Sequence, residues 1–141
     1  MLHLVHPALV HFTVAFLVAG ALLEAWGLLL RRPQAVRWGG GLTTAGTIAV
    51  VPTIAAGYLA ANSLTVADDA QRLLDRHESV GLMLFGVALV LLLVRAWMRG
   101  RIEEGARLPF ALGLLALAGL AGFAAFYGGQ LVYVFGVGVA R

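Results

Sequence analysis

The sequence predicts an all-α integral membrane protein, an up-down-up-down bundle of four helices built as a single domain over residues 1–141. Two observations predict it. Hydrophobic residues make up 61% of the chain and charged residues only 12%, about half the charged fraction of a typical soluble domain. Four stretches are also apolar over the roughly 20 residues that a membrane-crossing helix needs. This composition excludes an ordinary soluble globule, a disordered chain and a nucleic-acid-binding module.

The four expected spans cover about 7–30, 38–61, 78–98 and 108–127. Short connections between them favour antiparallel neighbours in the bundle. Gly128 and Gly129 are expected to end the fourth helix, because glycine commonly follows the last helical residue. Residues 128–141 are therefore expected to form a separate C-terminal segment.

The arginines distinguish the two ends of the bundle. The chain has no lysine, and the loops at 31–37 and 95–107 hold most of its arginines. Cytoplasmic loops carry the excess of basic residues in membrane proteins. The sequence therefore predicts a multi-pass protein of the bacterial inner membrane with both termini outside the cytoplasm.

The histidines are the candidate functional residues. All four of them, His3, His6, His11 and His77, are expected near the extracytoplasmic end. The first and third helices should run parallel at diagonal corners of the bundle, so that an imidazole from each can point at its centre. A polar side chain within a membrane span is costly and is often functional.

Three hypotheses account for these histidines. In the first, His11 and His77 are the axial ligands of a haem b, with His6 beside them and Arg72 or Arg76 paired with the haem propionates. In the second, His6, His11 and His77 bind copper or zinc, metals that imidazole suits. In the third, the histidines cap helix ends and bond to the backbone.

Other chemistry has little support. The chain contains no cysteine, which removes iron–sulfur clusters and the attachment of c-type haem. No nucleophile–base pair, phosphate-binding loop or internal repeat is apparent, so a redox carrier is favoured over an enzyme or a transporter. Glu24, the one acid inside a span, is expected to pair with Arg31 or Arg32 or to reach the nearby interface.

Two segments together resemble a known family. HPALVHF at 6–12 and GGQLVYVFGVGV at 128–139 resemble the bacterial four-helix membrane proteins of domain of unknown function 2231, which also have a histidine at the head of the third helix. The resemblance covers the full chain. It marks His6, His11 and His77, with Gln130 and Tyr133 in the closing motif, as the family's motif positions. Relatives joined to Rieske-type domains or found among respiratory proteins imply electron transfer.

The leading functional hypothesis is a small electron-transfer protein or subunit of the lipid bilayer that binds haem b near its outer face. Its redox partner would be a quinol or a larger membrane complex, with Gln130 and Tyr133 at the edge of the site. Two alternatives are a cofactor-free accessory subunit of a larger membrane complex and an outer-face protein that binds copper or zinc. Nucleic acid is not an expected partner.

Overall fold

Four long helices account for most of the chain. The computed structural model describes residues 2–63 and 66–139. These residues form α1 (Leu2–Leu29), α2 (Pro33–Asn62), α3 (Asp68–Trp97) and α4 (Arg107–Tyr133), with a short 3-10 helix, η1 (Glu104–Ala106), before α4. All four long helices are long and apolar enough to cross a membrane. The prediction of an all-α protein with four candidate membrane spans is therefore confirmed.

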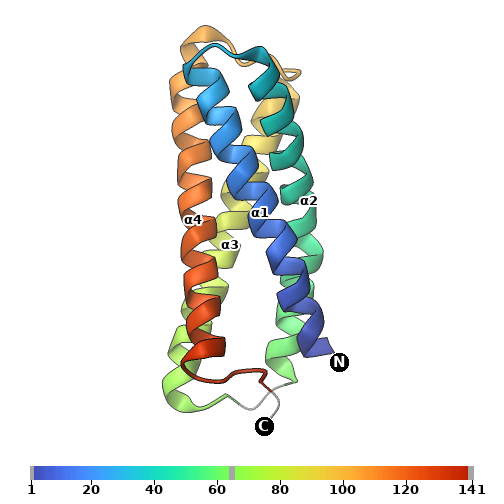
Figure 1. Ribbon diagram of the computed structural model, residues 1–141, viewed down its shortest axis with the longest axis vertical. Coiled ribbons are helices and arrows are strands. Elements are labelled where there is room, and N and C mark those ends of the chain that lie inside the picture. Colours follow the sequence, from blue (N-terminus) through green and yellow to red (C-terminus); the bar gives the residue numbers. More distant parts are fainter. Residues whose placement is uncertain (1, 64–65, 140–141) are drawn as a thin grey trace.

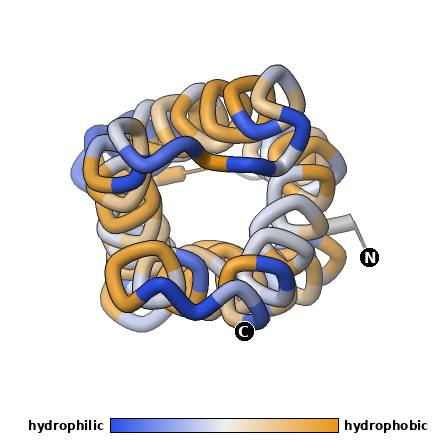
Figure 2. Tube along the Cα trace, turned by 90° about the horizontal axis from the view of Figure 1, so that it is seen from above, coloured by the Kyte–Doolittle hydropathy of each residue, from blue (hydrophilic) through white to orange (hydrophobic). Residues whose placement is uncertain are grey.

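Successive helices run in opposite directions and pack as a bundle (Figure 1). The view along the bundle shows the four helices at the corners of a quadrilateral, with apolar positions on their outer as well as their inner sides (Figure 2). α1 packs closely against α2 and also against α4, and α3 packs against α4 but only lightly against α2. The bundle therefore consists of two helical hairpins, α1–α2 and α3–α4, with α1 and α3 on one diagonal.

Backbone signals set the helix ends. Arg31 and Arg99 adopt left-handed conformations, with φ of 54° and 51°, which turn the chain out of α1 and α3. Pro33 is the first residue of α2, a position where its missing N–H costs nothing. α4 is followed by a turn at Gly136, with φ of 64°, a conformation that glycine adopts without strain.

Two helices extend beyond their predicted bounds. α3 begins at Asp68 rather than near 78, because residues 68–77 belong to the same continuous helix as the span. α4 continues through Gly128 and Gly129 to Tyr133, so the glycines do not end it and the separate segment is shorter than expected. Close packing explains Gly128 better, because it lies against the His77 ring.

The hydrophobic core lies mainly in the arginine-rich half of the bundle. Leu17, Leu114 and Leu117 are fully buried there, and further leucines and alanines from α1, α3 and α4 surround them. No residue of α1 before Leu17 whose side chain is described belongs to this core cluster. Most of this core cluster therefore lies away from the half that contains the histidines.

Glycines bring α1 and α2 into close contact. A Cβ added to Gly20 would lie 2.5 Å from the Thr43 backbone nitrogen, and one added to Gly39 would lie 2.4 Å from the Glu24 backbone nitrogen. Small residues at helix crossings allow such approach, which drives association where the hydrophobic effect between helices is absent. The α1–α2 hairpin is therefore the most tightly packed part of the molecule.

The two hairpins correspond at an offset of 71 residues, although the sequence alone shows no obvious repeat. His6 corresponds to His77 and Trp26 to Trp97 at this offset. α4 has six buried residues, and the residue 71 positions earlier in α2 is also buried in each case. These six residues of α4 are Phe110, Ala111, Leu114, Leu117, Ala121 and Leu131. Buried positions therefore recur at one offset in the two hairpins, although α1 and α2 pack more closely than α3 and α4 do.

Candidate functional site

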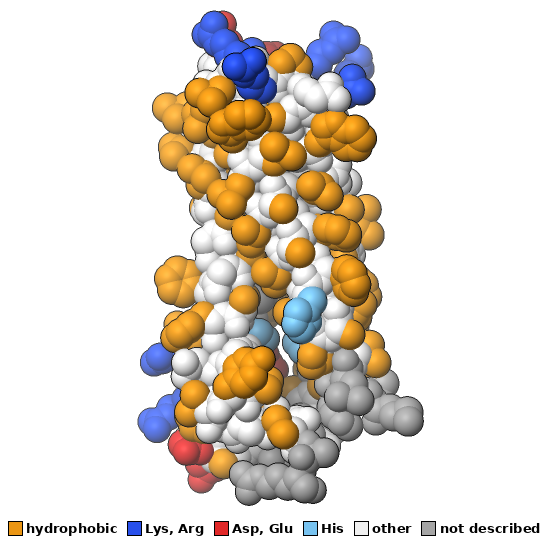
Figure 3. Space-filling view, in the orientation of Figure 1, with side chains coloured by type: hydrophobic (Ala, Val, Ile, Leu, Met, Phe, Trp, Pro, Cys, Tyr) orange, Lys and Arg blue, Asp and Glu red, His pale blue; other side chains and the backbone are white. Residues whose placement is uncertain are grey.

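Two histidines meet between the diagonal helices. His6 of α1 and His77 of α3 have ring centroids 6.2 Å apart, and their ring planes are inclined at 86°. Both side chains are half-buried. Figure 3 shows histidine side chains in the lower half of the molecule, at and behind a hollowed part of this face.

Each of the two imidazoles is held by a backbone carbonyl of the next helix along the chain. Nδ1 of His6 donates to the Thr53 carbonyl of α2 at 2.9 Å, and Nδ1 of His77 donates to the Ala124 carbonyl of α4 at 3.0 Å. Both bonds span 47 residues of sequence. Because Nδ1 carries the proton in each ring, Nε2 is the nitrogen with a free lone pair, the arrangement usual for metal-ligating histidines.

A glycine makes room for each ring. A Cβ added to Gly57 would lie 2.8 Å from Cε1 of His6, and one added to Gly128 would lie 3.2 Å from Cε1 of His77. Each glycine stands four residues after the carbonyl that accepts the hydrogen bond. The two halves of the site are therefore equivalent in ring, carbonyl and glycine, at the same 71-residue offset as the hairpins.

Hydroxyl groups adjoin the site on one side only. Thr13 of α1 and Thr53 of α2 are buried, and their Oγ1 atoms are hydrogen-bonded at 2.8 Å. The corresponding positions in the second hairpin are Leu84 and Ala124. The surroundings of His6 are consequently more polar than those of His77.

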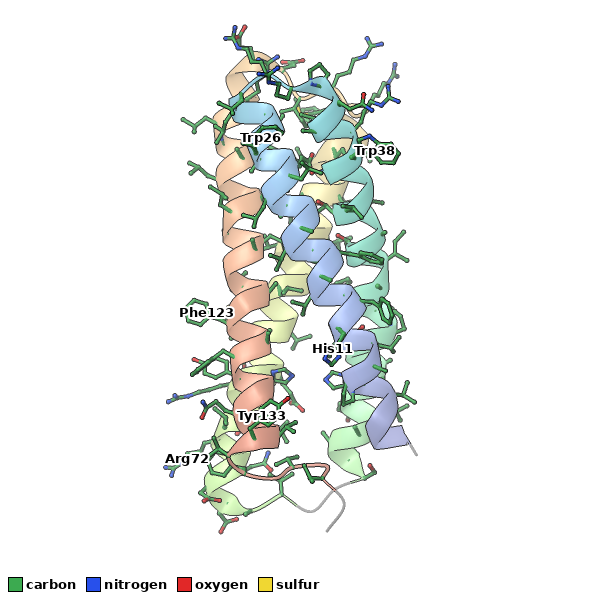
Figure 4. All side chains as sticks on the ribbon, viewed as in Figure 1. His11, Trp26, Trp38, Arg72, Phe123 and Tyr133 are labelled. Atoms are coloured by element: carbon green, nitrogen blue, oxygen red, sulfur yellow. The ribbon has the colours of Figure 1, made fainter. Side chains whose placement is uncertain are left out.

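His11 does not join the pair. Its side chain is exposed on α1, and its Nδ1 is hydrogen-bonded to the Pro7 carbonyl of the same helix (Figure 4). His6 and His11 are five residues apart, a rotation of about 140° around the helix, so only one of them can face the bundle centre. The structure thus places His6 opposite His77, where the sequence pointed to His11.

The other predicted site residues lie at the periphery. Arg72 and Arg76 are exposed on α3, and Arg72 projects away from the bundle (Figure 4). Tyr133 is 89% exposed, and Gln130 is half-buried. The side chain of His3 lies outside the described residues.

A buried ion pair crosses the same diagonal at the other end. Glu24 of α1 is 1% exposed, and its carboxylate accepts hydrogen bonds from Arg95 of α3 and, at 3.4 Å, from the Thr43 hydroxyl of α2. The Arg95 guanidinium lies 5.7 Å from the centre of the Phe110 ring of α4. Glu24 therefore pairs with Arg95 rather than with Arg31 or Arg32, and Arg31 bonds to Glu104 instead.

One feature of the sequence could have indicated that His6 pairs with His77 and Glu24 with Arg95. Glu24 follows His6 by 18 residues, and Arg95 follows His77 by 18, which is five full helical turns. The histidine and the charged residue therefore lie on the same face of each helix. Thr13 also lies on this face of α1. Polar side chains inside membrane spans generally face the bundle interior, so this stripe distinguishes His6 from His11.

The histidine site offers few ligands of its own. Among residues 2–63 and 66–139, as far as their side chains are described, no group of three or more His, Asp or Glu residues is arranged to hold a metal ion. The predicted set of His6, His11 and His77 is therefore not brought together. The arrangement can instead supply two imidazoles, one from each side.

Fold and site together define a four-helix membrane protein with a pair of inward-facing histidines on its diagonal. Comparison with protein families gives a match: residues 2–141 match the family described as predicted membrane protein, DUF2231. The chain belongs to this family, which confirms the resemblance inferred from the two terminal motifs. No curated protein and no solved structure matches the chain.

Proposed function

We propose that the protein is a membrane electron carrier that binds one haem b between His6 and His77. The single observation that carries this proposal is the matched presentation of two imidazoles, each held through Nδ1. Their Nε2 atoms would hold the haem iron, which would supply one-electron redox chemistry. Both axial positions would be taken by protein, which favours electron transfer over substrate turnover.

The spacing of the rings supports this proposal. A metal–imidazole bond is roughly 2 Å long and the ring centre lies about 1 Å beyond the nitrogen, so two imidazoles on opposite sides of one metal have centroids about 6 Å apart. The centroids of His6 and His77 are 6.2 Å apart.

The small number of ligands favours haem over a bare ion. Zinc usually takes three or four protein ligands, whereas haem iron needs only two because the porphyrin supplies the other four. Copper or zinc held by His6 and His77 remains the alternative ligand of this site. Neither the haem site nor the bare-ion site proposed here includes His11, Arg72 or Arg76, since their side chains are exposed on the outside of the bundle.

The proposed orientation places the site in the outer leaflet. The arginine-rich connections lie at the end opposite the histidines (Figure 3), and the positive-inside rule assigns that end to the cytoplasm of a bacterial inner membrane. The haem would then exchange electrons near the extracytoplasmic surface with a quinol or with a partner subunit.

The experiment is an absorption spectrum of protein purified from haem-replete cells, with a metal analysis of the same sample. We expect a Soret band and a sharp reduced α-band, both lost in His6→Ala and in His77→Ala. His11→Ala is the matched control and should keep the full spectrum. Colourless wild-type protein, or loss of the bands in His11→Ala alone, would refute the proposal, and stoichiometric copper or zinc without haem would select the bare-ion alternative.

A cofactor-free accessory subunit is the second candidate function. The outer face of α4 has a groove of about 430 Å³ lined by Gly119, Gly122, Phe123 and Phe126, and Figure 4 shows Phe123 projecting outward. Glycines on an outer helix face let a neighbouring helix approach closely. Tight co-purification with a membrane partner, unchanged when His6 and His77 are both replaced, would favour this role.

A further inference from the structure

The two hairpins are joined by an interface that does little to fix their relative height. Where α1 meets α4, the buried side chains are leucines and alanines, including Ala21, Ala25 and Ala121. Within lipid, apolar contact between helices gives no hydrophobic driving force, and small aliphatic side chains can interlock in more than one way. This interface alone leaves a slip of one helical turn between the hairpins inexpensive.

α1 and α3 contact each other only through side chains in the described part of the chain. Two of these contacts are polar or aromatic, and both join residues at equivalent positions of the two hairpins. His6 meets His77 at one end, and Glu24 meets Arg95 at the other. The pairs are separated along the helices by 18 residues, about 27 Å at the helical rise.

The ion pair is built for one register. Gly39 and Gly40 of α2 provide its space, because a Cβ on Gly40 would lie 2.1 Å from an Arg95 guanidinium nitrogen. Arg95 is the donor to Glu24, and its Nε has no partner among the described residues. If α3 shifted by one turn relative to α1, the Glu24 carboxylate, which is 1% exposed, would be left buried without its partner, which is strongly unfavourable.

We infer that the Glu24–Arg95 pair is a positioning device that sets the register of α3 against α1 and thereby brings His77 level with His6. Buried ion pairs contribute little net stability, and fixing register is the role best established for buried polar groups. Glu24 and Arg95 act on the histidine site through two rigid helices rather than by contact. The inference deepens the proposed function but depends only on the alignment of the histidines.

The test measures helix register without any ligand. The chain has no cysteine, so spin labels can be placed at Val5→Cys on α1 and Leu93→Cys on α3, exposed residues near opposite ends of the bundle, and their distance distribution can be measured by pulsed electron resonance. Wild type should give one narrow distribution. The apolar pair Glu24→Leu with Arg95→Met should give a broadened distribution or a second distance, changed by several ångströms because the line between these labels lies largely along the helices and a slip of one turn is about 5 Å.

Two controls make the result decisive. Labels at Val5→Cys and Tyr58→Cys lie within the α1–α2 hairpin and should stay narrow in every variant. The charge-swapped pair Glu24→Arg with Arg95→Glu should restore the narrow distribution between the hairpins, and this variant decides the matter if the apolar pair does not fold. An unchanged distribution in the apolar variant, a broad one in the swapped variant, or loss of folding in both overturns the inference. Since no haem is involved, failure of the haem proposal leaves this result intact.

Discussion

At the scale of single residues, the rotational position of a side chain decides whether it belongs to the site. The depth of the histidines and the helix that carries each could be predicted from the sequence, but the choice between His6 and His11 could not be made from apolar periodicity. Residues on every side of a membrane helix are apolar, because lipid and bundle interior both accept them. The sparse polar stripe of His6, Thr13 and Glu24 holds the information that periodicity lacks.

The glycines that seat the rings give a prediction at this scale. Gly57→Ala should displace the His6 ring, because the added Cβ would come within 2.8 Å of Cε1, and should lengthen its hydrogen bond to the Thr53 carbonyl. We expect less than half of the wild-type haem or metal content per protein, measured by pyridine haemochrome assay and elemental analysis.

Gly41→Ala is the matched control on the same helix. No atom lies within 4 Å of a Cβ at Gly41, so this variant should retain its ligand in full. Equal ligand content in the two variants would contradict the role given to Gly57.

At the scale of helices, the existence of the four helices could be predicted from the sequence, but their first and last residues were harder to predict. Four long apolar runs require four helices, since a lipid-exposed backbone must satisfy its own hydrogen bonds. The ends depend on contacts that the sequence does not display. Gly128 looks like a stop signal, yet it lies inside α4 because His77 of another helix needs the space that its missing side chain leaves.

The close α1–α2 crossing gives the second prediction. In Gly20→Ala the new Cβ would lie 2.5 Å from the Thr43 backbone nitrogen, and backbone cannot move aside as a side chain can. Overpacking of this kind costs about 1–3 kcal/mol, so the thermal unfolding midpoint in detergent should fall by several degrees. Gly119→Ala, which meets no atom within 4 Å, should show no loss, and an equal fall in both variants would count against this packing.

At the scale of the whole molecule, charge and packing are distributed along the bundle axis. The arginine-rich end carries the dense core and the exposed rings of Trp26, Trp38 and Trp97, two of which are labelled in Figure 4. Tyr58 and Tyr133 lie exposed toward the opposite end. Interfacial aromatic residues of this kind mark the headgroup levels of a bilayer, so the molecule has the length and the belts of a spanning protein.

Orientation in the membrane gives the third prediction. Because the native chain has no cysteine, Ser63→Cys and Arg101→Cys each introduce a single exposed thiol at opposite ends of the bundle. A membrane-impermeant maleimide should label Ser63→Cys in intact spheroplasts and Arg101→Cys only after permeabilisation. The reverse pattern would place the histidine site at the cytoplasmic surface and require a different electron donor.

The 71-residue correspondence also has a historical meaning. Tandem duplication of a gene for one helical hairpin leaves two halves with matching buried positions, as in α2 and α4. Before fusion, two identical hairpins would have paired as a homodimer, each contributing one histidine across a true symmetry axis. Such a dimer could not contain an unlike pair at positions 24 and 95, since like charges would have faced each other. An unlike pair at these two positions therefore requires a joined chain, in which the two equivalent positions can carry different residues.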